Sequence, residues 1–260
     1  MAVEATEVTE EPVLELRHIE KHFSGVSALS DGNFRLMNNE VHAIVGDNGA
    51  GKSTLLKVIA GAHQPDGGEY LIDGERAHIP MPTAAANYGI ATVFQDLALI
   101  DHLDSSANLF LGREVLRRPP LRWLGVLDKP AMRARAIEAV RQLKVGVKSV
   151  DQPLSGMSGG QRQAVAVARA VLFGTRIVVM DEPTAALGVR ETGAVLEMIR
   201  RLKANGLSVV MISHNLPDVF AVADRITILR LGRTVRTVRC DETNLEEIVG
   251  MMTGAWGDRA

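Results

Sequence analysis

Cysteine, aromatic residues, long apolar runs and an excess of one charge are all scarce in this sequence of 260 residues. The single cysteine, Cys240, cannot form a disulfide within the chain or a cysteine metal cage, which suits a reducing compartment. No apolar run approaches the roughly 20 residues that a membrane-spanning helix needs. Lysine and arginine number 29 against 31 acidic residues, so no basic field covers the whole chain and we expect no nucleic-acid partner.

What is present is typical of a globular α/β protein. Short β-type runs alternate with helical patterns, which predicts parallel βαβ units with helices on both faces of a sheet. The predicted strands are Val13–Arg17, Val41–Val45, Ile90–Phe94, Ile177–Met180, Ser208–Ile212 and Arg225–Leu229. The predicted helices are Lys52–Ala60, Pro130–Lys144, Gly159–Phe173, Arg190–Ala204 and Leu216–Ala223. Three pairs predict hairpin turns and therefore flanking antiparallel strands: Asp31-Gly32, Asp73-Gly74 and Leu231-Gly232.

The domain organisation follows from where the strand-like runs stop. Residues 96–174 have few such runs, so we interpret them as a helical subdomain inserted into a core made of residues 13–95 and 175–255. Within it, residues 113–130 read as an irregular loop, because the proline pair at 119 and 120 excludes a helix. Residues 1–12 are acidic and predict a flexible tail ahead of this single domain.

A glycine-rich segment follows the strand Val41–Val45 and opens a helix. It fits the pattern Gly-x-x-x-x-Gly-Lys-Ser/Thr with Gly46, Asp47, Asn48, Gly49, Ala50, Gly51, Lys52, Ser53 and Thr54. The glycines allow positive φ, so consecutive N–H groups can surround one anion at the positive end of the helix. Lys52 adds a charge for the β- and γ-phosphates, and Ser53 offers a hydroxyl to Mg²⁺. This phosphate loop predicts a nucleotide site, but kinases, GTPases and transport ATPases all share it.

Two acids follow the buried strand Ile177–Met180. Carboxylates at the end of a core strand are costly unless they meet a cation or perform chemistry. Asp181 is placed to hold Mg²⁺, and Glu182 could polarise an attacking water as general base. An acidic loop without a role is the alternative, which the phosphate loop upstream makes less favoured.

A second glycine-containing segment precedes the helix Gly159–Phe173. Ser158 is expected to cap this helix, while Gly159 and Gly160, followed by Gln161, leave its first N–H groups free for an anion. One nucleotide per chain does not obviously need two such sites. A plain helix cap is the alternative interpretation.

Five motifs in this order resemble the ATP-binding cassette family of transport ATPases, over about residues 13–250. They are the phosphate loop, Gln95 after a strand, the segment Ser158–Gln161, the run Ile177–Glu182 and the pair Ser213-His214. The resemblance implies a P-loop NTPase fold, with a RecA-like α/β core, a mainly parallel sheet, flanking antiparallel elements and an inserted helical subdomain. It also implies a homodimer that binds ATP and Mg²⁺ between its two chains.

The same resemblance assigns roles to single residues. Ser158, Gly159, Gly160 and Gln161 of one chain would face the phosphate loop of the other, where Ser158 and Gly160 would bind the γ-phosphate. Gln95 would touch Mg²⁺ and the attacking water at the hinge of the helical subdomain. The implied Mg²⁺ ligands are therefore Ser53, Gln95 and Asp181.

The resemblance also assigns roles to His214 and Phe23, and the sequence departs from the family pattern at Met157 and Gly188. His214 would contact the γ-phosphate and orient it together with Glu182. Phe23 would stack on adenine, with an ordinary core phenylalanine as the alternative. Met157 stands where leucine is usual, and Gly188 stands where many cassettes have aspartate. The second change puts communication between the two ATP sites through that position in doubt.

Three stretches narrow the resemblance to the ATPases of bacterial monosaccharide importers of the fructose, ribose, mannose and galactose class. They are residues 21–29 (KHFSGVSAL), 93–114 (VFQDLALIDHLDSSANLFLGRE) and 181–191 (DEPTAALGVRE). The implied partners are integral-membrane permease subunits and, functionally, a periplasmic or extracellular sugar-binding protein. The chain would then lie at the cytoplasmic face of the inner membrane as a peripheral protein.

A permease helix is expected to contact residues 95–101. Leu97, Leu99 and Ile100 would form an exposed apolar patch there, and packing inside the subdomain is the alternative. Arg117, Arg118, Arg122 and Trp123 read as a solvated surface, with contact to a membrane or nucleic acid as the alternative. The scattered histidines suggest no metal site.

Other function classes fit the sequence less well. A cassette that acts on nucleic acid or the ribosome is one alternative, but repair types carry a very long coiled coil, and here about a hundred residues without heptads lie between the motifs. An importer for a different small solute is another. A GTPase or small-molecule kinase is disfavoured because no Asn-Lys-x-Asp segment occurs.

Overall fold

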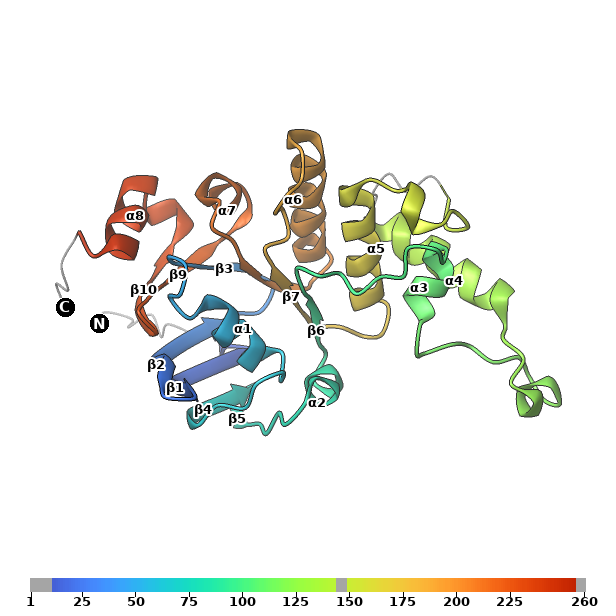
Figure 1. Cartoon of the computed structure of the whole chain (residues 1–260), viewed down its shortest axis with the longest axis horizontal. Helices are drawn as coiled ribbons and strands as arrows, with labels where there is room; N and C mark the ends of the chain where they lie inside the picture. Colours follow the sequence, from blue (N-terminus) through green and yellow to red (C-terminus); the bar gives the residue numbers. More distant parts are fainter. Residues whose placement is uncertain (1–10, 144–148, 256–260) are drawn as a thin grey trace, which may run out of the picture.

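The computed structural model describes residues 11–143 and 149–255 (Figure 1). A ten-stranded sheet runs through it in the order β5-β4-β1-β2-β10-β9-β3-β8-β7-β6. The strands are β1 Leu14–Phe23, β2 Val26–Leu36, β3 Val41–Val45, β4 Gly67–Ile72, β5 Glu75–Arg76, β6 Ile90–Val93, β7 Ile177–Asp181, β8 Ser208–Ile212, β9 Arg225–Arg230 and β10 Arg233–Arg239. Most of the predicted tail, residues 1–10, lies outside the described residues.

The helices include every helix that the sequence predicts. They are α1 Lys52–Ile59, α2 Pro82–Asn87, α3 Ser105–Phe110, α4 Lys129–Leu143, α5 Gly159–Val171, α6 Val189–Ala204, α7 Leu216–Val222 and α8 Leu245–Thr253. Short 3₁₀ turns occur at Leu121–Leu124, Leu154–Gly156 and Cys240–Glu242. The predicted mainly parallel α/β fold with antiparallel flanks is therefore confirmed.

The parallel half of the sheet consists of β9, β3, β8, β7 and β6. Its strands are rich in valine and isoleucine and are buried on both faces, as parallel strands must be. Alternate residues of β3 enter different cores: Ile44 packs with α1, whereas Ala43 and Val45 pack on the side of α5, α6 and α7. Because these strands run in one direction, their carboxyl ends share one edge of the sheet.

The antiparallel strands confirm two of the three predicted hairpin turns. The pairs Asp73-Gly74 and Leu231-Gly232 have positive φ at both residues and join β4 to β5 and β9 to β10. The prediction for Asp31-Gly32 is wrong, because this pair lies inside β2 beside a register shift against β1. A glycine next to an aspartate here accompanies a bulge rather than a turn. The turn between β1 and β2 is Ser24-Gly25 instead.

The helical part follows β6 and precedes β7, which are neighbours in the sheet. Helices α3, α4 and α5 pack on one another, and α5 also contacts α6 and β6 (Figure 1). The loop before α4 is irregular apart from the turn at Leu121–Leu124 and one bridge between Leu116 and Leu127. We propose that residues 96–174 form a helical subdomain inserted into the core.

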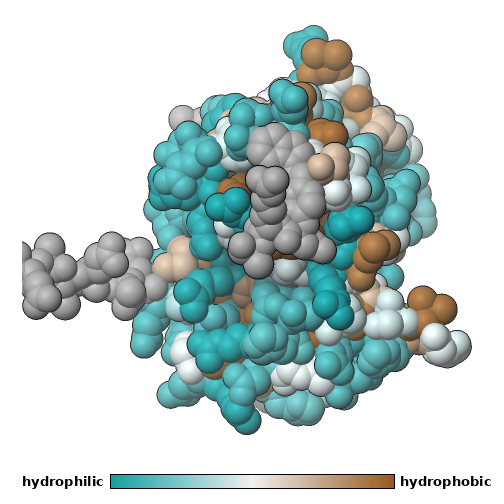
Figure 2. All heavy atoms as spheres, turned by 90° about the vertical axis from the view of Figure 1, so that its left-hand side faces the viewer, coloured by the Kyte–Doolittle hydropathy of each residue, from teal (hydrophilic) through white to brown (hydrophobic). Residues whose placement is uncertain are grey.

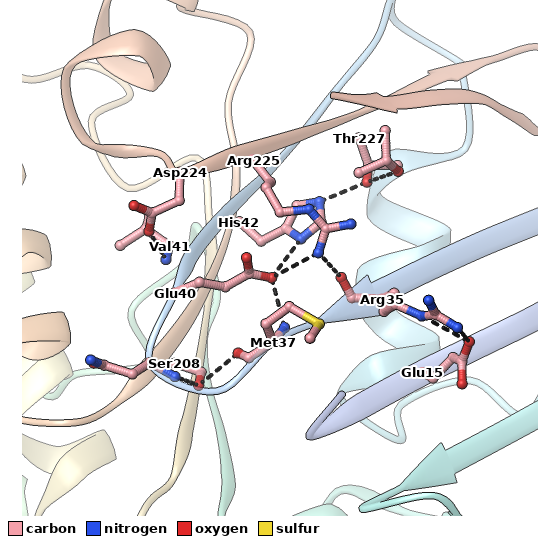
Figure 3. Close-up of polar contacts among 12 residues, drawn as sticks. Glu15, Arg35, Met37, Glu40, Val41, His42, Ser208, Asp224, Arg225 and Thr227 are labelled. Atoms are coloured by element: carbon pink, nitrogen blue, oxygen red, sulfur yellow. Dashed lines mark hydrogen bonds and ion pairs between the residues drawn. The ribbon is translucent and has the colours of Figure 1, made fainter. Parts of the chain in front are cut away.

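A buried polar cluster ties the amino end of β3 to its neighbours (Figure 3). His42 is fully buried, its Nδ1 lies 3.1 Å from Glu40 Oε1, and its Nε2 lies 2.7 Å from Thr227 Oγ1. Burial lowers the pKa of His42 although Glu40 opposes the shift. Burial works against the Glu40 carboxylate too, but hydrogen bonds from His42 and the Met37 N–H outweigh it and lower the pKa of Glu40. The pair is therefore a neutral imidazole beside a carboxylate.

This cluster predicts a specific loss of stability in acid. An unfolded histidine takes up a proton near pH 6.5, whereas buried His42 resists protonation, so stability falls as the pH drops below that value. His42→Gln should flatten the decline in the free energy of unfolding between about pH 7 and about pH 5.5. Urea denaturation at both pH values measures this. The exposed His102→Gln is the control, and equal slopes for His42→Gln and the wild type would contradict the assignment.

Candidate functional site

The phosphate loop joins β3 to α1 through backbone conformations that only glycine adopts easily. Gly46 has φ +156°, and a Cβ there would lie 2.3 Å from the carbonyl oxygen of Leu229. Gly51 has φ +102°, and its Cβ would lie 2.8 Å from the carbonyl oxygen of Ala28. Both glycines are therefore required by the close approach of neighbouring backbone. The loop is held between β3 and the turn that joins β9 to β10.

Lys52 turns its ammonium group back into this loop. Its Nζ donates to the carbonyl oxygens of Gly46 at 2.7 Å and Asp47 at 2.9 Å. The residue is buried, and burial lowers the pKa of the ammonium group while the charge of Glu182 opposes the shift. Asp47, Asn48, Gly49 and Ser53 are exposed. An anion arriving from solution can thus meet a poorly solvated cation.

The carboxyl end of β7 carries the two acids, which lie near this cation. Burial and the charge of Glu182 raise the pKa of Asp181, the last residue of β7. Glu182 has φ +49°, and its N–H donates to the carbonyl oxygen of Ile212 in β8 at 3.0 Å. Its Oε2 lies 2.8 Å from Nδ1 of His214. The structure therefore brings together the acid and the histidine that the sequence singled out.

Gln95 follows β6 and lines an open depression together with Gly159, Glu182 and Leu187. A Cβ on Gly159 would lie 2.7 Å from Cδ2 of Leu187, so α5 begins tightly against the segment before α6. None of residues 46–54 is among the lining residues of this depression. The start of α5 thus shares this depression with Gln95, whereas the phosphate loop of the same chain lies outside it.

The start of α5 is exposed and capped. The N–H of Ser158 donates to Oε1 of Gln161 at 3.0 Å, and Ser158 is exposed. Gly160 is buried, and its Cβ would lie 3.2 Å from Cβ of Glu191 in α6. The glycine pair is therefore explained in part by the packing of α5 on α6. The cap residue Ser158 is the exposed part of this helix start, where another molecule can reach it.

Gly188 begins α6 as its N-cap residue. Its φ of −70° does not require glycine, but a Cβ there would lie 2.7 Å from Oε2 of Glu191. An aspartate at this position would place a second carboxylate against the first, which is unfavourable. The carboxylate of Glu191 thus explains why glycine is favoured over aspartate at position 188 in this chain.

Arg169 on α5 is an important residue that the motif search missed. Its guanidinium donates to the carbonyl oxygens of Leu97 and Ala98, both at 2.8 Å, and burial lowers its pKa. It therefore fixes the segment after Gln95 to the helix that starts at Gly159. An arginine within a helix of small apolar residues was the available signal.

The apolar residues after Gln95 are not an exposed patch. Leu97, Leu99 and Ile100 are half-buried, and Leu97 and Leu99 pack against the core, so the expectation of exposure is wrong. Arg169 holds the backbone of Leu97 on α5, and Asn108 of α3 holds the backbone of Ile100 through both its N–H and its carbonyl oxygen. An apolar groove opens instead between β6 and α5, lined among others by Phe94, Leu111, Ala170 and Phe173.

Phe23 ends β1 and is 39% exposed, which excludes the alternative of a core phenylalanine. Its ring makes an edge contact with His63, with centroids 5.1 Å apart, and Nζ of Lys21 lies 5.4 Å from the ring centre. A flat apolar surface at the tip of the hairpin is thus open to a ligand.

The donor chemistry of the site suits a hard cation. Asp181, Ser53 and Gln95 offer a carboxylate, a hydroxyl and an amide oxygen, the ligand types that Mg²⁺ prefers. A cation would also relieve the unfavourable proximity of Asp181 and Glu182. In residues 11–143 and 149–255, no cluster of three or more histidine, cysteine or acidic side chains forms a separate metal site. Across the same part of the chain no helix has the length and apolar character to cross a membrane.

A phosphate loop at the end of the buried parallel strand β3, with two acids at the carboxyl end of β7 two strands away, defines a nucleoside-triphosphate-binding cassette. A family model described as ABC transporter matches residues 29–185. The chain belongs to the ABC transporter family, as an ATP-binding cassette that hydrolyses ATP in the course of transport.

Several relatives and solved structures are similar over most of this chain. The Fructose import ATP-binding protein FrcA of Rhizobium meliloti is 44% identical, with 95% of this chain and 96% of the relative covered. The Xylose/arabinose import ATP-binding protein XylG of Sulfolobus acidocaldarius is 43% identical, with 93% and 94% covered. The Ribose import ATP-binding protein RbsA of Bacillus subtilis is 41% identical, and the match spans 93% of this chain but 48% of the relative.

Two crystal structures of ATP-binding cassettes share the fold. An ABC transporter cassette in its ADP conformation superposes with a TM-score of 0.78 at 26% identity, over 93% of this chain and 95% of the other. A dimeric post-hydrolysis cassette bound to ADP and phosphate superposes with a TM-score of 0.71 at 25% identity, over 87% and 98% of the chains.

The role of Arg169 can be measured. Arg169→Ala leaves two carbonyl groups without a charged donor, so we expect faster hydrogen exchange in residues 96–101 and a loss of about 1–3 kcal/mol of stability. Arg162→Ala is the control, since the Arg162 guanidinium makes a long surface pair of 3.8 Å with Asp101 and its loss should cost less than about 1 kcal/mol. Unchanged exchange in Arg169→Ala would show that another contact fixes this segment.

Proposed function

We propose that this chain is the ATP-hydrolysing subunit of a bacterial importer for monosaccharides and works as a homodimer. The observation that carries the catalytic part is the pair Glu182 and His214, which lies beside Lys52 of the phosphate loop. The relatives named for the import of fructose, ribose and xylose or arabinose support the sugar class.

In this proposal each residue of the site acts on one part of the triphosphate. The backbone N–H groups of residues 46–54 surround the phosphates, and Lys52 exchanges its two carbonyl partners for phosphate oxygens. Phe23 stacks on the adenine ring. Glu182 accepts a proton from the attacking water, and His214 holds this carboxylate while contacting the γ-phosphate.

Ser53, Gln95 and Asp181 would hold the magnesium ion. When bound, Mg²⁺ neutralises charge on the phosphate oxygens. The raised pKa of Asp181 supports this assignment, because a half-buried carboxylate beside Glu182 is unfavourable without a cation. Gln95 would also contact the attacking water. A shift of the segment after Gln95 would move α5, because Arg169 bonds that segment to α5.

We propose a dimer because Gly159, at the start of α5, lines the depression around Gln95, whereas residues 46–54 of the same chain do not. The start of α5 is therefore available to the phosphate loop of a second copy. Ser158, Gly159, Gly160 and Gln161 would complete the ATP site of the second copy. A solved cassette that is dimeric with ADP and phosphate bound supports the pairing of two copies. ATP would bind the closed pair better than the open one, and hydrolysis would reverse the closure.

The permease would occupy the apolar groove between the core and the helical subdomain. Leu111 and Phe173 are exposed there, and the groove adjoins the segment that Arg169 anchors. Movement of the subdomain relative to the core would thus reach the membrane protein. This places the chain at the cytoplasmic face of the inner membrane, with a sugar-binding protein outside.

The catalytic assignment predicts the behaviour of Glu182→Gln. Loss of a general base should lower the rate of ATP hydrolysis by about 100-fold or more, while ATP binding remains. The variant should form an ATP-dependent dimer that persists, measured by sedimentation with and without the nucleotide. Glu191→Gln, on the first turn of α6, is the charge-matched control. Turnover at the wild-type rate in Glu182→Gln would remove Glu182 from this role.

The sugar class is tested by reconstitution with a monosaccharide permease and its sugar-binding protein. ATP hydrolysis in such proteoliposomes should rise when a monosaccharide-loaded binding protein is added. Stimulation by an amino acid or an oligopeptide in place of every monosaccharide would contradict the proposed cargo.

A further inference from the structure

A loop projects from the helical part between α3 and α4 and has no role in the proposed catalytic cycle (Figure 1). We call residues 115–128 the projecting loop. It is ordered by backbone hydrogen bonds: the N–H of Asp128 donates to Val115 O at 2.7 Å, and the N–H of Arg117 donates to Val126 O at 2.9 Å. It is a defined hairpin-like projection, closed by the 3₁₀ turn Leu121–Leu124.

The tip of the projecting loop exposes large apolar side chains. Residues 116–127 are all exposed, and Trp123 and Leu124 reach 81% and 77%. The other exposed large apolar residues of the loop are Leu116, Leu121, Val126 and Leu127. Single exposed leucines are ordinary, but a group of six on one projection indicates a surface that is covered in function. The opposite end of the molecule is mainly hydrophilic, with small separate apolar groups (Figure 2).

The charge of the projecting loop has one sign at its tip. Arg117, Arg118 and Arg122 lie there, and no aspartate or glutamate occurs from 115 to 127. Within the part of the chain that the structure describes, their guanidinium groups make no ion pair. On the neighbouring helix α4, by contrast, Arg133 pairs with Asp151 and Arg141 with Glu138. The three tip arginines are thus free for an external anion.

We propose that the projecting loop binds the surface of an anionic lipid bilayer. Tryptophan and leucine next to arginine is the combination that enters the boundary between headgroups and acyl chains, where the ring and the guanidinium are both satisfied. Anionic headgroups complement the three unpaired arginines. A nucleic acid would use the arginines but would leave the exposed leucines in water. The contact with lipid needs no permease, so a test of it is independent of the proposed function.

The experiment uses the full chain and vesicles without any other protein. The sequence has two tryptophans, and Trp256 lies outside the described residues, so Trp256→Phe leaves Trp123 as the only indole reporter. We expect this protein to sediment with phosphatidylglycerol-containing vesicles and its emission to shift to the blue. Vesicles of phosphatidylcholine alone should bind far less.

Two variants separate the charged and apolar contributions. Replacing Arg117, Arg118 and Arg122 with glutamine should weaken partitioning about 100-fold. Trp123→Ser with Leu124→Ser should weaken it about tenfold or more. Both should keep the ATP hydrolysis rate of the soluble protein, because these side chains contact no part of the site.

The matched control replaces Arg133, Arg135 and Arg141 with glutamine on the same helical part, and it should bind vesicles like the wild type. Three results would overturn the proposal. They are no binding to anionic vesicles, equal binding by the tip and control variants, and binding of the loop to a duplex oligonucleotide without any blue shift on vesicles.

Discussion

The shared carboxyl edge of the parallel strands is the constraint on which the site depends. Strands β3, β8, β7 and β6 are adjacent, so the residues that follow them must emerge side by side. The register pairs Ile212 with both Ile44 and Asp181, which aligns the phosphate loop, the acids and the Ser213-His214 segment. Gln95 follows β6 at the same edge. Residues more than a hundred positions apart, such as Lys52 and Glu182, thus share one site.

The electrostatics of this edge favour a bound ligand. Lys52 has a lowered pKa and Asp181 a raised one, both mainly because burial removes their charges from water. A phosphate beside Lys52 and a cation beside Asp181 would compensate both groups at once. Glu182 is held by a backbone bond to β8 and by His214, so it is oriented before any ligand arrives. Binding free energy is therefore available for closing the proposed dimer rather than for ordering the site.

Strand and helix positions in the core were predictable because periodicity and glycine motifs are local signals. The pairing of β4 with β1, and the bulge beside Asp31, depend on partners outside the local sequence, which a local pattern does not contain. Glu182, His214 and the phosphate loop were found by their motifs. Arg169 and the packing of Gly160 on Glu191 were missed, because their importance arises only when α5 is placed against other elements.

The central claim is that two copies of this chain complete each other's ATP sites, and it can be tested by a disulfide between copies. In a background with Cys240→Ser and Glu182→Gln, chains with Asn48→Cys are mixed with chains that carry Ser158→Cys. The account predicts a disulfide-linked heterodimer under mild oxidation with ATP and Mg²⁺, and little without nucleotide. Bound ATP with no crosslink between the two kinds of chain would contradict it.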